Sequence, residues 1–121
     1  VPVLITDVLK TERPLGHGRV LTANDAEHTA PLVLAAGFWA GITLYQESKC
    51  TQQRAIDMVE RYGADRLWLN CACDWGNSDP LSVPKTALEM RKRGHSEEAI
   101  DFLIYRNPCR FLGQNPVFTL S

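Results

Sequence analysis

The chain has 121 residues, of which 45% are hydrophobic and 22% are charged, proportions that are typical of a single globular domain. It is too short for a complete eight-stranded α/β barrel, which needs at least about 200 residues. Its formal net charge of −1 argues against nucleic acid as the main partner, because phosphate binding needs a basic face. No apolar run approaches the roughly 18 residues of a membrane span, so we expect no membrane partner.

The amino-terminal segment VPVLITDVLK has neither a basic start nor a cleavage site, so we expect no signal peptide. The first residue is Val rather than Met, which suggests a processed chain or a fragment. The cysteines at positions 50, 71, 73 and 109 form no CxxC pair. In the absence of a secretory signal we expect reduced thiols and a cytoplasmic location.

The order of apolar and polar segments predicts strands that alternate with helices. Apolar and β-branched runs predict strands at 2–9, 20–25, 38–45 and 65–72. Helical periodicity, capping residues and terminal glycines predict helices at 26–37, 52–62, 85–94 and 97–107, with a last helical turn or two at 108–113. Thr51 is the expected N-cap of the second helix, and Gly63 is expected to end it.

Strands and helices that alternate through short connections favour parallel strands with right-handed crossovers. We therefore expect an α/β fold: a partial (β/α) barrel-like unit of about four parallel strands with flanking helices. The chain is expected to form a single domain over 1–121. Residues 1–18 match no recognisable unit, residues 19–113 carry the β/α units, and residues 114–121 form a tail.

Functional residues of parallel α/β folds gather at the carboxyl ends of the strands. Polar residues of this chain stand at those places: Asn24 and Asp25, Tyr45 and Glu47, and Asn70 and Asp74. Asp74 comes after a buried strand, where a carboxylate can bind a metal and accept a proton from a metal-activated water. The same residue could instead cap the loop DWGNSD as an Asx turn, and the local sequence leaves both interpretations open.

The other candidate ligands form no complete metal site. His28, in the run DAEH, is the histidine nearest a predicted strand end, and its simpler interpretation is a polar residue in the first turn of a helix. Cys71 and Cys73 are interpreted as packing residues at a strand end. Trp75, in the next loop, is a candidate to line a ligand pocket. The sequence contains no HxH, no HExxH and no Cys/His ribbon.

Residues 37–113 resemble the last part of TatD-like metal-dependent hydrolases of the amidohydrolase superfamily. The most specific piece is DWGNSDPLSVPKTALEMRKRG, and the closing NPCRFLG resembles the terminal helix of those enzymes. The resemblance implies an eight-stranded α/β barrel with a divalent metal, usually zinc, at its carboxyl face. It also implies hydrolysis of an ester, amide, phosphoester or nucleic-acid bond.

On this resemblance, Asp74 occupies the position of the catalytic carboxylate and metal ligand after the last strand. We add His28 as a second metal ligand. The expected substrate contacts are Asn24, Glu47, Trp75 and Asp79. The His-x-His of the family's first strand is missing, and Asn24 stands where the family pattern would offer a histidine.

The sequence supports two main hypotheses for function. In the first, the chain is the carboxyl-terminal portion of a TatD-like hydrolase acting on a small-molecule or phosphoester substrate, and the missing barrel half is supplied by another chain or by the parent protein. In the second, it is a non-catalytic half-barrel used as an oligomerisation or binding module, because open strand edges promote association into a homo-oligomer. A third hypothesis, a small α/β domain that binds a metabolite, names no ligand.

Overall fold

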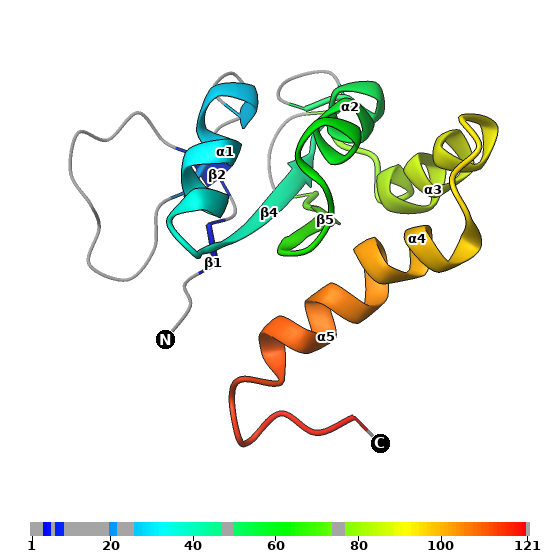
Figure 1. Ribbon diagram of the computed structural model, residues 1–121. Helices are drawn as coiled ribbons and strands as arrows, with labels where there is room; N and C mark the ends of the chain where they lie inside the picture. The colour runs from blue at the N-terminus through cyan, green and yellow to red at the C-terminus, as the bar shows by residue number, and fades with distance from the viewer. Residues whose placement is uncertain are drawn as a thin grey trace.

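A computed structural model describes residues 4–5, 7–8, 20–21, 26–46, 50–73 and 77–120, with side chains described from residue 30 onward. Figure 1 shows the elements in chain order. They are β1 (Leu4–Ile5), β2 (Asp7–Val8), β3 (Val20–Leu21), α1 (Ala26–Ala35), β4 (Trp39–Leu44), α2 (Gln52–Tyr62), β5 (Leu67–Cys71), α3 (Ser82–Lys92), α4 (Glu97–Asp101), the π-helical turn η1 (Phe102–Arg106) and α5 (Asn107–Leu112).

The sheet is built on the parallel pair β4 and β5. Their register places Ala40 opposite Leu67 and Leu44 opposite Cys71. The two residues of β1 add to the other edge of β4, also in parallel, which gives the strand order β1-β4-β5. Strands β2 and β3 pair in parallel in a separate sheet.

The prediction of a partial barrel-like unit with about four parallel strands is wrong. Among the described residues, the β4–β5 ladder is the only one longer than two residue pairs. The predicted strand at 2–9 is divided between two sheets, and the strand predicted at 20–25 is described only at its first two residues. Two-residue strands form too few ladder hydrogen bonds to extend a barrel wall, whereas the apolar runs of β4 and β5 sustain a longer ladder.

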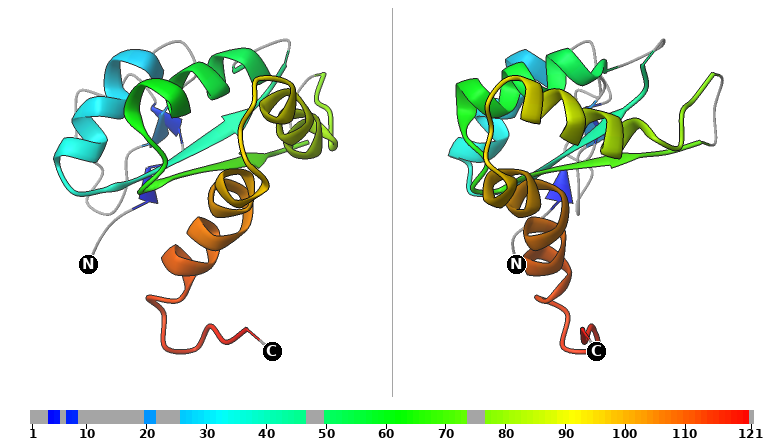
Figure 2. Two further views of the ribbon diagram at one scale, coloured as in Figure 1. Left: turned by 45° about the vertical axis from the view of Figure 1, so that its right-hand side comes forward. Right: turned by 90° about the vertical axis from the view of Figure 1, so that its right-hand side faces the viewer.

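Alternate residues of β4 and β5 point to opposite faces of the sheet. One face, which we call the core face, packs against helices α1 to α4 and η1 (Figure 2). Its strand residues are Ala40, Ile42, Leu44, Leu67 and Leu69, all buried in the main hydrophobic cluster. The opposite face, which we call the tryptophan face, consists of Trp39, Gly41, Thr43, Trp68 and Asn70.

Helix α2 has the predicted bounds. The Thr51 hydroxyl oxygen accepts a hydrogen bond from the backbone N–H of Arg54 at 3.2 Å, and Gly63, at φ 78°, comes directly after the last turn. Helix α3 begins at Ser82, three residues before the predicted start. The Ser82 N–H and hydroxyl both donate to the Asp79 carbonyl, at 3.1 and 2.8 Å, so contacts that the sequence pattern does not show determine this end.

Helices α4, η1 and α5 form one continuous helical segment from Glu97 to Leu112. Its middle turn is wider than an α-helical turn, and the Asn107 N–H donates to the Phe102 carbonyl five residues back. Pro108 explains the widening, because it has no N–H and its ring crowds the carbonyl four residues before it. The wide turn carries Asn107 into the interior, where it is fully buried.

The Asn107 amide holds the beginning of β5. Its nitrogen donates to the Leu67 carbonyl at 2.7 Å and also to the Ala64 carbonyl. Its oxygen accepts a hydrogen bond from Arg110 at 2.8 Å. The Arg110 guanidinium also lies over the Trp39 ring, 5.2 Å from its centroid. One buried side chain therefore ties the carboxyl-terminal helical segment to the turn that starts β5.

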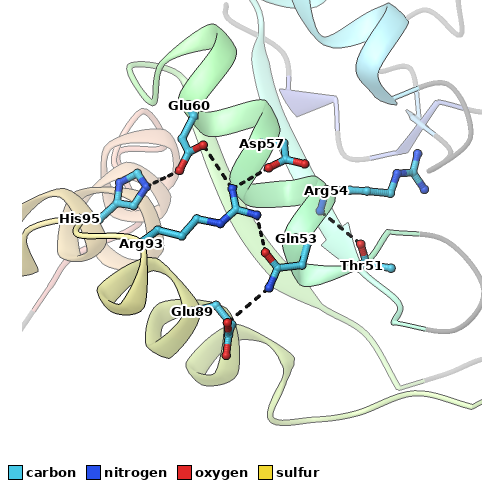
Figure 3. Close-up of polar contacts among 8 residues, drawn as sticks. All are labelled: Thr51, Gln53, Arg54, Asp57, Glu60, Glu89, Arg93 and His95. Atoms are coloured by element: carbon cyan, nitrogen blue, oxygen red, sulfur yellow. Dashed lines mark hydrogen bonds and ion pairs between the residues drawn. The ribbon is translucent and has the colours of Figure 1, made fainter.

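A polar network on the surface ties α2 to the end of α3 (Figure 3). Arg93 forms ion pairs with Asp57 at 2.6 Å and Glu60 at 3.2 Å and also donates to Gln53. The hydrogen bond to Asp57, and after it the nearby carboxylate charges, raise the pKa of Arg93 above its ordinary value. His95 contacts the other oxygen of Glu60 at 2.8 Å. These contacts join α2 to the turn that follows α3 on the surface of the molecule.

Replacing Asn107 by Ala should destabilise the fold strongly, because two carbonyls and an Arg110 donor lose their partner. We expect Asn107→Ala to lower the free energy of unfolding by about 2–4 kcal/mol, measured by urea denaturation. Asn115→Ala is the matched control, since the exposed Asn115 side chain only accepts a hydrogen bond from the Val117 N–H, and it should cost less than about 0.5 kcal/mol. Equal effects would contradict the role assigned to Asn107.

Candidate functional site at the carboxyl ends of β4 and β5

The two longest strands that the structure describes end side by side. Because β4 and β5 are parallel, with Thr43 opposite Asn70 and Leu44 opposite Cys71, the loops after them leave from the same edge of the sheet. The Tyr45 N–H donates to the Cys50 carbonyl at 3.1 Å, which closes the first loop onto the start of α2. The carboxyl ends of β4 and β5 are therefore the place where polar loop residues of this chain can converge.

The predicted residues relate to this place in different ways. Asn24, Glu47, Asp74 and Trp75 lie outside the described residues. Glu47 belongs to the loop after β4, and Asp74 and Trp75 to the loop after β5, so their loops begin next to each other. His28 belongs to α1, which runs antiparallel to β4 and has its amino-terminal end on the carboxyl-end side of that strand (Figure 1). The assigned roles stay predictions.

Asp79 is placed at the end of the loop after β5. One carboxylate oxygen accepts a hydrogen bond from the Leu81 N–H at 2.9 Å, and the other pairs with Lys85. The Lys85 hydrogen bond, and after it the Leu81 N–H, lower the pKa of Asp79 below its ordinary value of 3.8. The structure therefore gives Asp79 a clear task in starting α3, and its predicted contact with substrate stays a prediction.

The cysteines of this region have ordinary surroundings. The Cys71 thiol is partly buried and lies 3.6 Å from the Pro80 carbonyl, to which it donates. Cys73 is exposed. Within the part of the chain that the structure describes, no three His, Cys, Asp or Glu side chains are grouped so that they could hold a metal ion. The described residues alone therefore do not form a metal site.

The tryptophan face has a polar end and an aromatic end. Thr43 and Asn70 lie opposite each other near the carboxyl ends of the strands, and both are partly buried. At the amino end, Phe111 of α5 packs on Trp39 and Trp68 with ring centroids 5.9 and 5.5 Å apart. Asn70 is one of the polar residues that the sequence places at a strand end, whereas Thr43 is not, although alternation along each strand indicates that the two lie on the same face.

Trp68 carries an unpaired polar atom. Its indole nitrogen is buried, and no described residue accepts a hydrogen bond from it. A buried donor without an acceptor costs about 1–3 kcal/mol. The cost of this unpaired N–H therefore offsets part of the stability that Trp68 gains by packing on Phe111.

A second concentration of charge is the polar network around Arg93 described above, which we call the Arg93 network. It lies between α2 and α3 (Figure 3). Asp57 and Glu60 are engaged with Arg93, and Glu89 pairs with Lys92 at 2.6 Å. The Lys92 hydrogen bond lowers the pKa of Glu89 below its ordinary value of 4.5, against partial desolvation. These carboxylates already have cationic partners, so this network serves helix packing and is not a candidate active site.

Comparisons with known proteins add no relative: no protein-family model, no curated protein and no solved structure matches the chain. Among the described residues, no helix is both long enough and apolar enough to cross a membrane. The function is therefore inferred from the residues and from the geometry of the strand ends.

The Asp79 contacts predict a pH-dependent contribution to stability. Because the pKa of Asp79 is lower in the folded chain than its ordinary value of 3.8, its stabilising effect is complete above that value and is lost as the pH falls through the lowered folded value. Asp79→Asn should thus lower the free energy of unfolding at neutral pH and have little effect in strong acid. In a Lys85→Met background the neutral-pH effect should shrink; an unchanged effect would contradict the Lys85 pairing.

The unpaired indole N–H of Trp68 predicts that replacing Trp68 and replacing Trp39 by Phe have different effects on stability. Trp68→Phe removes the orphan donor and keeps a ring against Phe111, whereas Trp39→Phe reduces a well-buried ring that also contacts Arg110. We expect Trp68→Phe to leave the protein about 1–2 kcal/mol more stable than Trp39→Phe, compared by urea denaturation. The reverse order would show that the Trp68 indole N–H has a partner in solution.

Proposed function

We propose that the chain contributes part of a metal-dependent hydrolase site of the TatD-like type at the carboxyl ends of β4 and β5. The observation that supports this is the parallel register of the two strands. It starts the loop that contains Glu47 and the loop that contains Asp74 at neighbouring points. The segment DWGNSDPLSVPK, which carries the resemblance to those hydrolases, begins in the second of these loops.

In this proposal, Asp74 is a metal ligand and accepts a proton from the attacking water. A divalent metal, with zinc as the first choice, would lower the pKa of a bound water to about 7. His28 is the second proposed ligand. The amino-terminal end of α1, to which it belongs, lies toward the carboxyl end of β4, where the proposed site is located (Figure 1). Asn24, Glu47 and Trp75 are the proposed substrate contacts, and Asp79 is proposed to hold the loop around the substrate.

The proposed substrate class is a small molecule with an ester, amide or phosphoester bond. A catalytic zinc site normally uses about three protein ligands and keeps one open position. Asp74 and His28 supply two, and the described side chains include no group of three ligands. The site therefore needs at least one further ligand, from residues outside the described part or from another chain.

Metal analysis tests this proposal on the purified chain prepared without chelators. We expect zinc or a similar divalent metal to bind in a defined ratio, and Asp74→Asn to lose it together with any hydrolysis of a nitrophenyl ester or phosphodiester. Asp101→Asn is the matched control, because the Asp101 carboxylate pairs with Arg106 in the carboxyl-terminal helical segment, outside both loops, and it should retain the metal. Equal metal content in both variants, or none in the wild type after zinc is added, would contradict the proposal.

A second candidate function is a non-catalytic association or binding module. The observation that favours it is the outer edge of β5, the edge away from β4. No other strand among the described residues pairs with β5, and unpaired strand edges promote association.

A further inference from the structure

We propose that two copies of this chain associate by antiparallel pairing of β5 with β5, around a two-fold axis that passes at Asn70. This association is independent of hydrolysis. It gives the binding-module candidate a definite partner, a second copy of the chain, and a definite register along the strand.

The hydrogen-bonding directions of β5 are set by its register with β4. The Ala40 N–H donates to the Arg66 carbonyl at 2.8 Å, and Ala40 is opposite Leu67. In a parallel ladder this places the main-chain groups of Arg66, Trp68 and Asn70 toward β4. The N–H and C=O groups of Leu67, Leu69 and Cys71 point the other way, to the outer edge.

The first of these outer residues is already satisfied within the chain. The Leu67 N–H donates to the Ala64 carbonyl at 3.4 Å, and the Leu67 carbonyl accepts from Asn107 at 2.7 Å. For Leu69 and Cys71, the structure contains no main-chain partner on this edge among the residues that it describes. The open part of the edge is therefore short and sharply bounded, with two donors and two acceptors.

This open part is self-complementary. With the axis at Asn70, Leu69 of one copy lies opposite Cys71 of the second copy, and the same pair repeats on the other side of the axis. Each pair exchanges two N–H···O=C bonds, as in a hydrogen-bonded antiparallel pair. The arrangement satisfies all four open groups on each copy. A two-fold interface requires this kind of matching, in which one patch serves both partners.

The side chains of β5 do not oppose self-pairing. The strand reads LWLNC, without a charge or a proline, whereas proteins commonly protect exposed edges with Lys, Pro or bulges. The formal net charge of −1 gives little repulsion between copies. The two Asn70 side chains meet at the axis in a closely spaced pair, where each amide can donate to and accept from the other.

A second copy also enlarges the sheet. The described sheet has three strands and is already covered by helices on its core face, and β4 and β5 are its only strands with more than two described residues. Joining two copies produces a continuous β4–β5–β5–β4 sheet. Because the axis is perpendicular to the sheet, the core faces of both copies, with α1 to α4 and η1, remain on one side. The tryptophan faces, each with Phe111 of α5 packed on it, lie on the other side.

Sedimentation of the full chain over a range of concentrations tests the proposal. We expect a monomer–dimer equilibrium that Asn70→Lys weakens by about tenfold or more, because it places two like charges together at the axis. Gln114→Lys, which adds the same charge to an exposed amide near the carboxyl terminus, should leave the equilibrium unchanged. A wild-type chain that stays monomeric, or a dimer that Asn70→Lys does not weaken, would overturn the proposal.

Cross-linking tests the register with a milder substitution. In a Cys73→Ser background, Asn70→Cys should form an intermolecular 70–70 disulfide on oxidation, because the closely spaced pair brings the two Cα atoms within disulfide range. The Cys73→Ser background alone should give no such product. Dimers without the 70–70 link would overturn the register. Loss of association with metal binding intact refutes this inference alone, and loss of metal binding with association intact refutes only the hydrolase proposal.

Discussion

The buried amide of Asn107 fixes where β5 begins, and the sheet depends on that strand. It donates hydrogen bonds to the carbonyls of Ala64 and Leu67 and accepts one from Arg110. Arg110 in turn lies over the Trp39 ring and donates to the Asp65 carbonyl at 3.0 Å. A buried polar group stabilises a fold only when it is hydrogen-bonded. The wide turn before Pro108 aims Asn107 at these partners, so a local irregularity of the helix sets the start of a strand 40 residues earlier in the chain.

Beyond the Asn107 contacts, the main-chain hydrogen bonding of the outer edge changes along β5. Its first outer-edge residue, Leu67, is capped by the chain itself, and the next two, Leu69 and Cys71, are open among the described residues. The strand then leads into the loop that contains Asp74. The proposed hydrolysis uses the loop after the carboxyl end of β5, and the proposed association uses the outer edge of the same strand. Pairing around Asn70 leaves one strand-end site on each copy, so neither proposal requires the other.

The parts of the fold that local sequence determines were predictable. Thr51, Gly63 and the apolar stripe between them define both ends of α2, and the continuous apolar run of β5 identifies a strand. The start of α3 was missed although the contacts that set it are local: the Asp79 carboxylate accepts a hydrogen bond from the Leu81 N–H, and the Asp79 carbonyl accepts one from the Ser82 hydroxyl. The prediction of a four-stranded unit was wrong because the alternation of strands and helices indicates parallel strands but does not determine how many residue pairs each ladder contains. Among the described residues, the amino-terminal strands have two residues each.

For the candidate site, the sequence predicts the shared edge at which the loops after β4 and β5 begin. The roles of Asn24, Glu47, Asp74 and Trp75 stay predictions, because these residues lie outside the described part of the chain. Parallel strands require that the residues after β4 and β5 start at one edge, and the register confirms that their ends are adjacent. The engagement of Asp79 with Lys85 was not predictable, because it depends on how the loop folds back on α3. The importance of Thr43 and Asn70 depends on which face of the strands the helices cover. The strand β4 reads WAGITL, with no regular alternation of apolar and polar residues, so the sequence does not show which face the helices cover. In the structure both faces of β4 are largely buried.

Amide hydrogen exchange along β5 tests the central claim most directly, namely that β5 is bonded to β4 on one side, capped at Leu67 and open at Leu69 and Cys71. The account predicts that the Trp68 and Asn70 amides are protected at every protein concentration, because they donate to β4. The Leu69 and Cys71 amides should exchange faster in dilute solution and gain protection as the concentration rises. Concentration-independent protection of Leu69 and Cys71 equal to that of Trp68 and Asn70 would contradict the account.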